Sequence, residues 1–156
     1  MGMRLVWLAA AALALTACVR LSFARKMGGD ELRLRASVHA YYAEVSAAFA
    51  AGSPDALAAR FDPAIARPMT HAQIRAWGEK FFGEHGPAAF KAERVEIESI
   101  GYREAVVLLA YRVTTRSGKG DFAGVERDHL VRRGAGWVVA SWEKVDEPAP
   151  ATINRK

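Results

Sequence analysis

The chain has 156 residues, of which 51% are hydrophobic and 25% are charged, which is ordinary usage for one globular domain and excludes an intrinsically disordered chain. The formal net charge is +5, from 22 basic and 17 acidic residues that are interspersed along the sequence. Because no stripe of basic residues is evident, we expect no nucleic-acid binding.

The chain begins with an apolar segment that follows Arg4 and runs from Leu5 to Ala17. This run is shorter than the roughly 20 residues of a transmembrane helix, and a positive charge followed by such a run is typical of a signal peptide. The alternative is an uncleaved anchor, because apolar residues continue past Arg20 as far as Ala24.

The end of the apolar run resembles the lipobox of bacterial lipoproteins. Leu15, Thr16 and Ala17 stand where signal peptidase recognises an aliphatic residue and two small residues, and Cys18 stands where the lipid is attached. The resemblance implies cleavage before Cys18 and a protein exported and lipid-anchored to the cell envelope membrane, facing the periplasm or the outside. Cys18 is the single cysteine, so no internal disulfide can form, and we expect neither a metal site nor a cofactor.

The remaining sequence divides into a tether, one domain and a tail. We predict a signal peptide over residues 1–17, a lipidated cysteine and tether over 18–29, a folded domain over 30–145, and a disordered tail over 146–156.

Three helices are predicted in the first part of the domain. Asp30 is a candidate N-cap for a long helix that Gly52 ends, with one apolar face. That face carries Leu34, Val38, Tyr41 or Tyr42, Val45 and Phe49. Ser53 and Pro54 start a short second helix, and Thr70 with Gln73 forms the capping box of a third.

Four strands are predicted to follow, joined by glycine-containing turns. They lie around Val95–Ile97, over Ala105–Thr115, over Phe122–Arg132 and over Trp137–Val145. The second is apolar on both faces around Val106–Ala110, which indicates that both faces are covered. Helices first and an antiparallel meander second indicate an α+β architecture.

This order, together with the Gly-Trp hairpin over Val131–Trp142, resembles the NTF2-like superfamily and its SnoaL-like members. The resemblance implies a cone, in which three N-terminal helices pack on a curved antiparallel sheet of about four strands and leave a pocket at the wide end. It also implies a possible homodimer through the outer sheet face. Ala140 and Ser141 stand where family enzymes often carry histidine or aspartate, which argues against the best-known enzymatic versions.

Four residues are the candidates for a pocket. His129 shares its strand face with Val125 and Val131, which predicts that it points inward and that Glu126 and Asp128 point away. Tyr42 and Tyr111 each carry a hydroxyl that needs a partner, and Trp142 is the final aromatic residue of the hairpin.

Three functional hypotheses remain open at this point. The first is a non-catalytic lipoprotein domain that binds a small apolar ligand or a protein partner. The second is a SnoaL-like enzyme of the isomerase, cyclase or dehydratase type with His129 as its base. The third is a scaffold subunit of an envelope complex, which requires a filled cone and an apolar outer sheet face.

Overall fold

Three helices precede four strands in the computed structural model, which describes residues 28–146. The helices are α2 (Gly29–Ala51), α3 (Pro54–Ala58) and α4 (His71–His85); the strands are β1 (Ala88–Ile100), β2 (Glu104–Thr115), β3 (Phe122–Arg133) and β4 (Gly136–Lys144). This order confirms the predicted α+β class. The predicted signal peptide, lipidated Cys18 and most of the tether and tail lie outside the described residues.

The starts of α3 and α4 follow the predicted capping chemistry. Thr70 Oγ1 accepts a hydrogen bond from the Gln73 backbone N–H at 3.3 Å, and Gln73 Oε1 accepts one from the Thr70 backbone N–H at 2.8 Å. Ser53 Oγ accepts from the Ala56 backbone N–H at 3.2 Å, with Pro54 in the first turn. Both caps are therefore confirmed, and they fix where each helix enters the fold.

The long helix α2 begins two residues earlier than predicted. Gly29 is already helical, so Asp30 lies inside the first turn and is not the N-cap. Gly52 ends the helix with φ at 60°, a conformation that glycine adopts without steric cost. None of the helices among residues 28–146 is long and apolar enough to cross a membrane.

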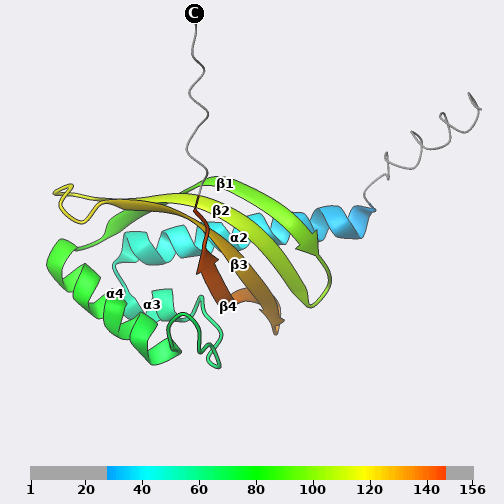
Figure 1. Cartoon of the computed structure of the whole chain (residues 1–156), viewed down its shortest axis with the longest axis horizontal. Helices are drawn as coiled ribbons and strands as arrows, with labels where there is room; N and C mark the ends of the chain where they lie inside the picture. The colour runs from blue at the N-terminus through cyan, green and yellow to red at the C-terminus, as the bar shows by residue number, and fades with distance from the viewer. Residues whose placement is uncertain (1–27, 147–156) are drawn as a thin grey trace, which may run out of the picture. The chain divides into compact units, whose positions relative to one another are not determined.

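The sheet is an antiparallel meander in the order β1-β2-β3-β4, and it curves over α2 (Figure 1). The inner face of β2 packs into the core through Ala105, Val107 and Leu109, which are all buried. The helices α3 and α4 lie beside the open end of the curve (Figure 1). Among the described residues, 31–146 form one compact unit built from these layers.

The outer face of the sheet carries apolar residues beneath an ionic network. Val106, Leu108 and Ala110 of β2 are half-buried. Arg127 on β3 forms ion pairs with Glu98 on β1 at 2.9 Å and with Glu143 on β4 at 2.8 Å. Arg127 lies opposite Leu108 in the β2–β3 register, so these ion pairs cross the outer face beside Leu108. The homodimer predicted through this face stays a prediction.

The edge of β4 that does not pair with β3 forms backbone hydrogen bonds with the segment that follows α3. The Asp62 backbone N–H donates to the Val139 carbonyl at 2.8 Å, and the Val139 N–H donates to the Arg60 carbonyl at 3.0 Å. The buried Asp62 carboxylate accepts two hydrogen bonds from Arg133, at 2.9 and 2.7 Å. These contacts hold Phe61 against Trp142, with ring centroids 5.4 Å apart, at the open end of the sheet.

Candidate functional site: a cavity with two carboxyl groups

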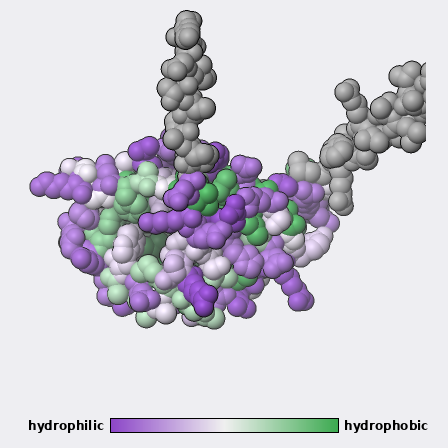
Figure 2. Space-filling model, in the orientation of Figure 1, coloured by the Kyte–Doolittle hydropathy of each residue, from purple (hydrophilic) through white to green (hydrophobic). Residues whose placement is uncertain are grey.

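A cavity of about 170 Å³ lies between α2, the α3–α4 segment and the inner face of the sheet. Its walls are mostly apolar and aromatic: Tyr41, Tyr42, Val45, Phe49, Leu57, Phe61, Met69, Ile74, Trp77, Phe90, Leu109, Tyr111, Phe122, Val139 and Trp142. Two carboxyl groups, from Glu126 and Asp128 of β3, complete the lining. Figure 2 shows apolar residues reaching the surface between α4 and the sheet.

The Tyr111 ring is held in place by its neighbours on three sides. Phe90 stacks on it with ring centroids 5.6 Å apart, and Phe122 meets it edge-on at 6.1 Å. Gly124 lies opposite Tyr111 in the β2–β3 register, and a Cβ at that position would come within 3.0 Å of the tyrosine hydroxyl oxygen. The glycine therefore leaves the space into which the Tyr111 hydroxyl extends.

Asp128 is the more deeply buried of the two carboxyl groups, with only 2% of the residue exposed. Its Oδ2 accepts a hydrogen bond from the Tyr42 hydroxyl at 2.8 Å. Its Oδ1 is buried and has no hydrogen-bond partner among the described residues while Glu126 is ionised, and the Glu126 carboxyl can donate to Asp128 only when it holds a proton. A buried polar atom without a partner is costly, so this oxygen is a strong acceptor left available at the cavity wall.

Burial raises the pKa of both carboxyl groups. It raises the pKa of Asp128 from its ordinary 3.8 to about 6, although hydrogen bonds with Tyr42 and Glu126 oppose the shift. Burial and then the charge of Asp128 raise the pKa of Glu126 from 4.5 to about 8. Near neutral pH the pair therefore holds one proton, for which Glu126 has the higher affinity, and the protonated carboxyl can donate to its neighbour.

The phenols around the pair remain protonated over the whole physiological range. Burial is the largest cause of the raised pKa of Tyr41, Tyr42 and Tyr111. The negative charge of Asp128 also raises the pKa of each tyrosine. Each hydroxyl is therefore available as a donor. The Tyr41 hydroxyl donates to the Arg60 carbonyl at 2.9 Å, while hydrogen bonding between Tyr111 and Glu126 partly lowers the pKa of the carboxyl.

No lysine, arginine or histidine is among the residues that line the cavity. Lys144 lies opposite Glu126 in the β3–β4 register, and its charge is the weakest of the effects on the pKa of that carboxyl. Within residues 28–146 no group of three or more His, Cys, Asp or Glu side chains could hold a metal ion. The cavity is thus acidic and phenolic, without a cation of its own.

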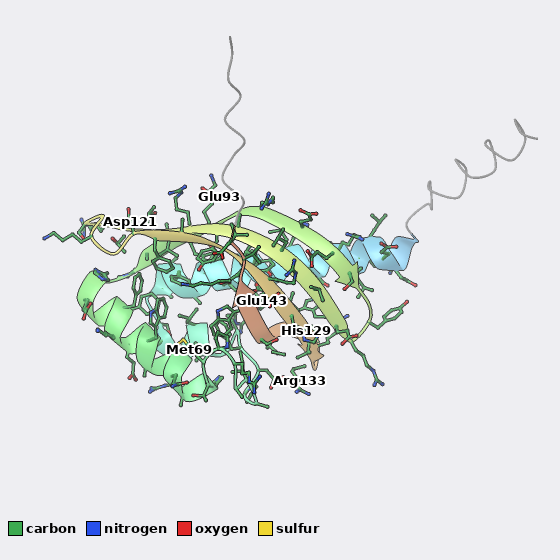
Figure 3. All side chains as sticks on the ribbon, in the orientation of Figure 1. Met69, Glu93, Asp121, His129, Arg133 and Glu143 are labelled. Carbon is green, nitrogen blue, oxygen red and sulfur yellow. The ribbon has the colours of Figure 1, made fainter. Side chains whose placement is uncertain are left out.

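The predicted orientation of β3 was wrong. His129 lies on the outer face, with 43% of its side chain exposed and its Nε2 3.5 Å from Glu104 Oε2, and it does not line the cavity (Figure 3). Glu126 and Asp128, predicted to point away, face inward. The more apolar face of β3, with Val125, is the outer one, because the inner carboxyl groups find tyrosine hydroxyls as partners.

The other three predicted pocket residues, Tyr42, Tyr111 and Trp142, all line the cavity. Trp142 reaches it because the β3–β4 pairing shifts register between His129 and Leu130. Trp137 and Val139 are both buried on the inner side before this irregularity, and after it Trp142 lies opposite Asp128. The shift in register thus changes which alternate positions of β4 face inward.

Three residues that line the cavity, Trp77, Glu126 and Asp128, are absent from the four predicted pocket positions. Trp77 is 37% exposed and lines the cavity. Glu126 and Asp128 were missed, yet one signal for them exists in the sequence. They share alternate positions with Phe122 and the fully buried Leu130, so counting from those residues would have placed both carboxyl groups inside.

No protein-family model matches the chain, and no curated protein matches it. Several solved structures are similar. Bd1075 from Bdellovibrio bacteriovorus has a TM-score of 0.64 at 8% identity over 79% of this chain, which spans only 44% of that protein. A single-residue variant of Rv3472 from Mycobacterium tuberculosis, of unknown function, has a TM-score of 0.64 at 15% identity, covering 78% of this chain and 77% of its own.

A candidate scytalone dehydratase from Novosphingobium aromaticivorans has a TM-score of 0.59 at 15% identity, covering 83% of this chain and 99% of its own. Another similar structure, from Nostoc punctiforme, is described as having a cystatin-like fold. At these identities the likeness concerns the fold alone. The chain has the NTF2-like, cystatin-like cone fold, with helices first and a curved four-stranded antiparallel sheet second.

Proposed function

We propose that the protein is an exported, membrane-tethered lipoprotein whose cone binds a small, largely apolar ligand without transforming it. The observation that carries this proposal is the cavity itself, which has aromatic walls and a polar wall formed by Glu126 and Asp128. Ligand sites are characteristically apolar with a few placed polar groups that orient the ligand.

The size of the cavity limits the ligand. An engineered apolar cavity of roughly 150 Å³ is large enough to bind benzene. The cavity here, at about 170 Å³, therefore suits one aromatic ring with a short substituent. A neutral probe of that size is 2-phenylethanol, which offers one ring and one hydroxyl.

Uptake of 2-phenylethanol by the full chain in lipid bicelles tests the proposal. Isothermal titration calorimetry, with bicelles alone as the blank, is expected to show saturable binding at one site per chain. Heat that matches the blank throughout the titration would contradict ligand binding.

The proposal of a lipid tether is based on the lipobox residues, with Cys18 as the lipidated position. We expect intact-mass spectrometry of membrane-extracted protein to give the mass of a chain cleaved before Cys18 and carrying acyl chains. The Cys18→Ser variant lacks the thiol to which lipid is joined, so the acylated mass should disappear. An unprocessed mass in both proteins would instead mean an N-terminal anchor.

The cavity also favours ligand binding over a scaffold role. A scaffold requires a filled cone, whereas this cone encloses an open volume. It also requires an apolar outer face, whereas Arg127 and its two glutamate partners cross the outer face of the sheet.

A second candidate function is proton-transfer catalysis, with the carboxyl groups in the role first assigned to His129. The observation in its favour is a pair of buried carboxyl groups whose pKa values are about 6 and about 8, beside protonated phenols. Such a pair can accept and return a proton near neutral pH. Phenylacetone in deuterated water is a probe: an enzyme would accelerate exchange of its α-hydrogens, and Asp128→Asn would abolish the acceleration. Exchange at the uncatalysed rate would contradict catalysis and leave ligand binding as the proposed function.

A further inference from the structure

The cavity contains a buried carboxylate acceptor whose charge is offset only by a proton on the neighbouring carboxyl group, because no basic side chain lines the cavity. Asp128 Oδ1 is buried and accepts no hydrogen bond among the described residues while Glu126 is ionised, and Glu126 lies on the same face of the same strand. The cavity-lining residues include no basic side chain. A buried charge is costly unless it is paired, so the site is most stable when a cation or a proton joins the carboxyl groups.

We propose, building on the ligand-binding function above, that the ligand is a small aromatic or apolar amine whose ammonium group binds between Glu126 and Asp128. The ring would occupy the aromatic part of the cavity, and an ammonium N–H would donate to Asp128 Oδ1. Tyr42 already holds Oδ2 at 2.8 Å, which leaves Oδ1 as the acceptor for the incoming group.

The groups that surround Glu126 allow this exchange. Asp128 faces it from β3, Tyr111 from β2, and Tyr41 and Tyr42 from α2, and none of these can supply a positive charge. Among residues 28–146, Lys144 on β4 is the one cation that acts on the pKa of Glu126, and its effect is the smallest of those on that group. An ammonium that arrives at the pair therefore replaces the proton of Glu126, which leaves to solvent while the ammonium N–H takes over its hydrogen bond to Asp128.

The test compares three probes that share one ring: 2-phenylethylamine, 2-phenylethanol and phenylacetate. Titration calorimetry on the full chain in bicelles is expected to show the amine binding at least about ten-fold more tightly than the alcohol, with phenylacetate weaker than both. Affinity for the amine should rise with pH as Glu126 deprotonates. The binding heat should also depend on the ionisation enthalpy of the buffer, because a proton is released.

Two variants identify the groups responsible. In Asp128→Asn the preference for amine over alcohol should vanish while the alcohol still binds, which shows that the variant folds. In Glu126→Gln proton release should vanish, because the amide has no proton to lose in this range. If Asp128→Asn fails to bind the alcohol, the Glu126→Gln variant provides the test. Loss of proton release on amine binding in this variant supports the proposal, and unchanged proton release overturns it.

The outcomes separate the two proposals. Equal affinity for the amine and the alcohol, or tighter binding of phenylacetate, would overturn the amine assignment and leave ligand binding standing. Binding of the amine with no proton release in the unchanged chain would overturn the exchange at Glu126. Failure of all three probes to bind would overturn the proposed function and the amine assignment together.

Discussion

Glu126→Gln is expected to stabilise the protein at alkaline pH and to leave its stability at acid pH almost unchanged. The pKa of Glu126 is raised in the fold, from 4.5 to about 8. Its contribution to stability is therefore present when the group is protonated, below its unfolded pKa, and is lost as the pH rises through the folded value. Asp128, raised to about 6, contributes in the same direction at lower pH.

The size of this effect follows from the pKa difference. At roughly 1.4 kcal/mol per pKa unit, the free energy of unfolding should fall by about 2–4 kcal/mol between about pH 5 and about pH 8.5. Glutamine has nearly the same shape and stays neutral, and its amide can still donate to Asp128 Oδ1. The variant should therefore lose most of this decline.

Urea unfolding of the full chain in bicelles, followed by near-ultraviolet circular dichroism, measures the effect at both pH values. Glu96→Gln is the matched control, because Glu96 lies exposed on the outer side of the sheet, and its variant should follow the unchanged chain. Parallel pH profiles for Glu126→Gln and the unchanged chain would show that Glu126 does not take up a proton in the cavity.

Val45→Trp is expected to abolish ligand uptake without unfolding the domain. Val45 projects from α2 into the cavity and is buried. The added indole would occupy volume that is now empty, so uptake of 2-phenylethanol should weaken by at least about 100-fold, equivalent to about 3 kcal/mol. Filling an existing cavity costs less than overpacking a filled core, so the domain should still unfold cooperatively.

The matched control is Ala47→Trp. Ala47 lies on the same helix, two residues along, and is exposed. The control adds a similar bulk outside the cavity and should bind the probe as the unchanged chain does. Equal binding by the Val45 and Ala47 variants would place the probe somewhere other than this cavity.

The fold could be predicted from the sequence because its signals are local. Thr70 and Gln73 predict the start of α4 because they cap its free backbone N–H groups. Gly52 predicts the end of α2 because glycine adopts a positive φ without steric cost. The order of helices and strands then leaves few architectures. The start of α2 was misplaced by two residues because a terminal turn depends weakly on any single side chain.

The site could be predicted only in part, because it depends on which face of β3 points inward. The apolar pattern favoured the face of Val125 and His129. That assignment failed because Asp128 on the opposite face accepts a hydrogen bond from Tyr42 on the distant helix α2. Tyr42 is 86 residues from its partner Asp128, and no local pattern encodes that contact. The register shift beside Leu130 is a second non-local cause, since it depends on the pairing of two strands.

The position of a bound probe tests the central claim most directly. Intermolecular NOEs between 2-phenylethanol and the methyl groups of the full chain in bicelles should reach Leu109 and Val139, which line the cavity. They should be absent for Leu108 and Val138, the neighbours of these residues on the same strands that do not line it. NOEs to Leu108 and Val138 alone would contradict a ligand site inside the cone.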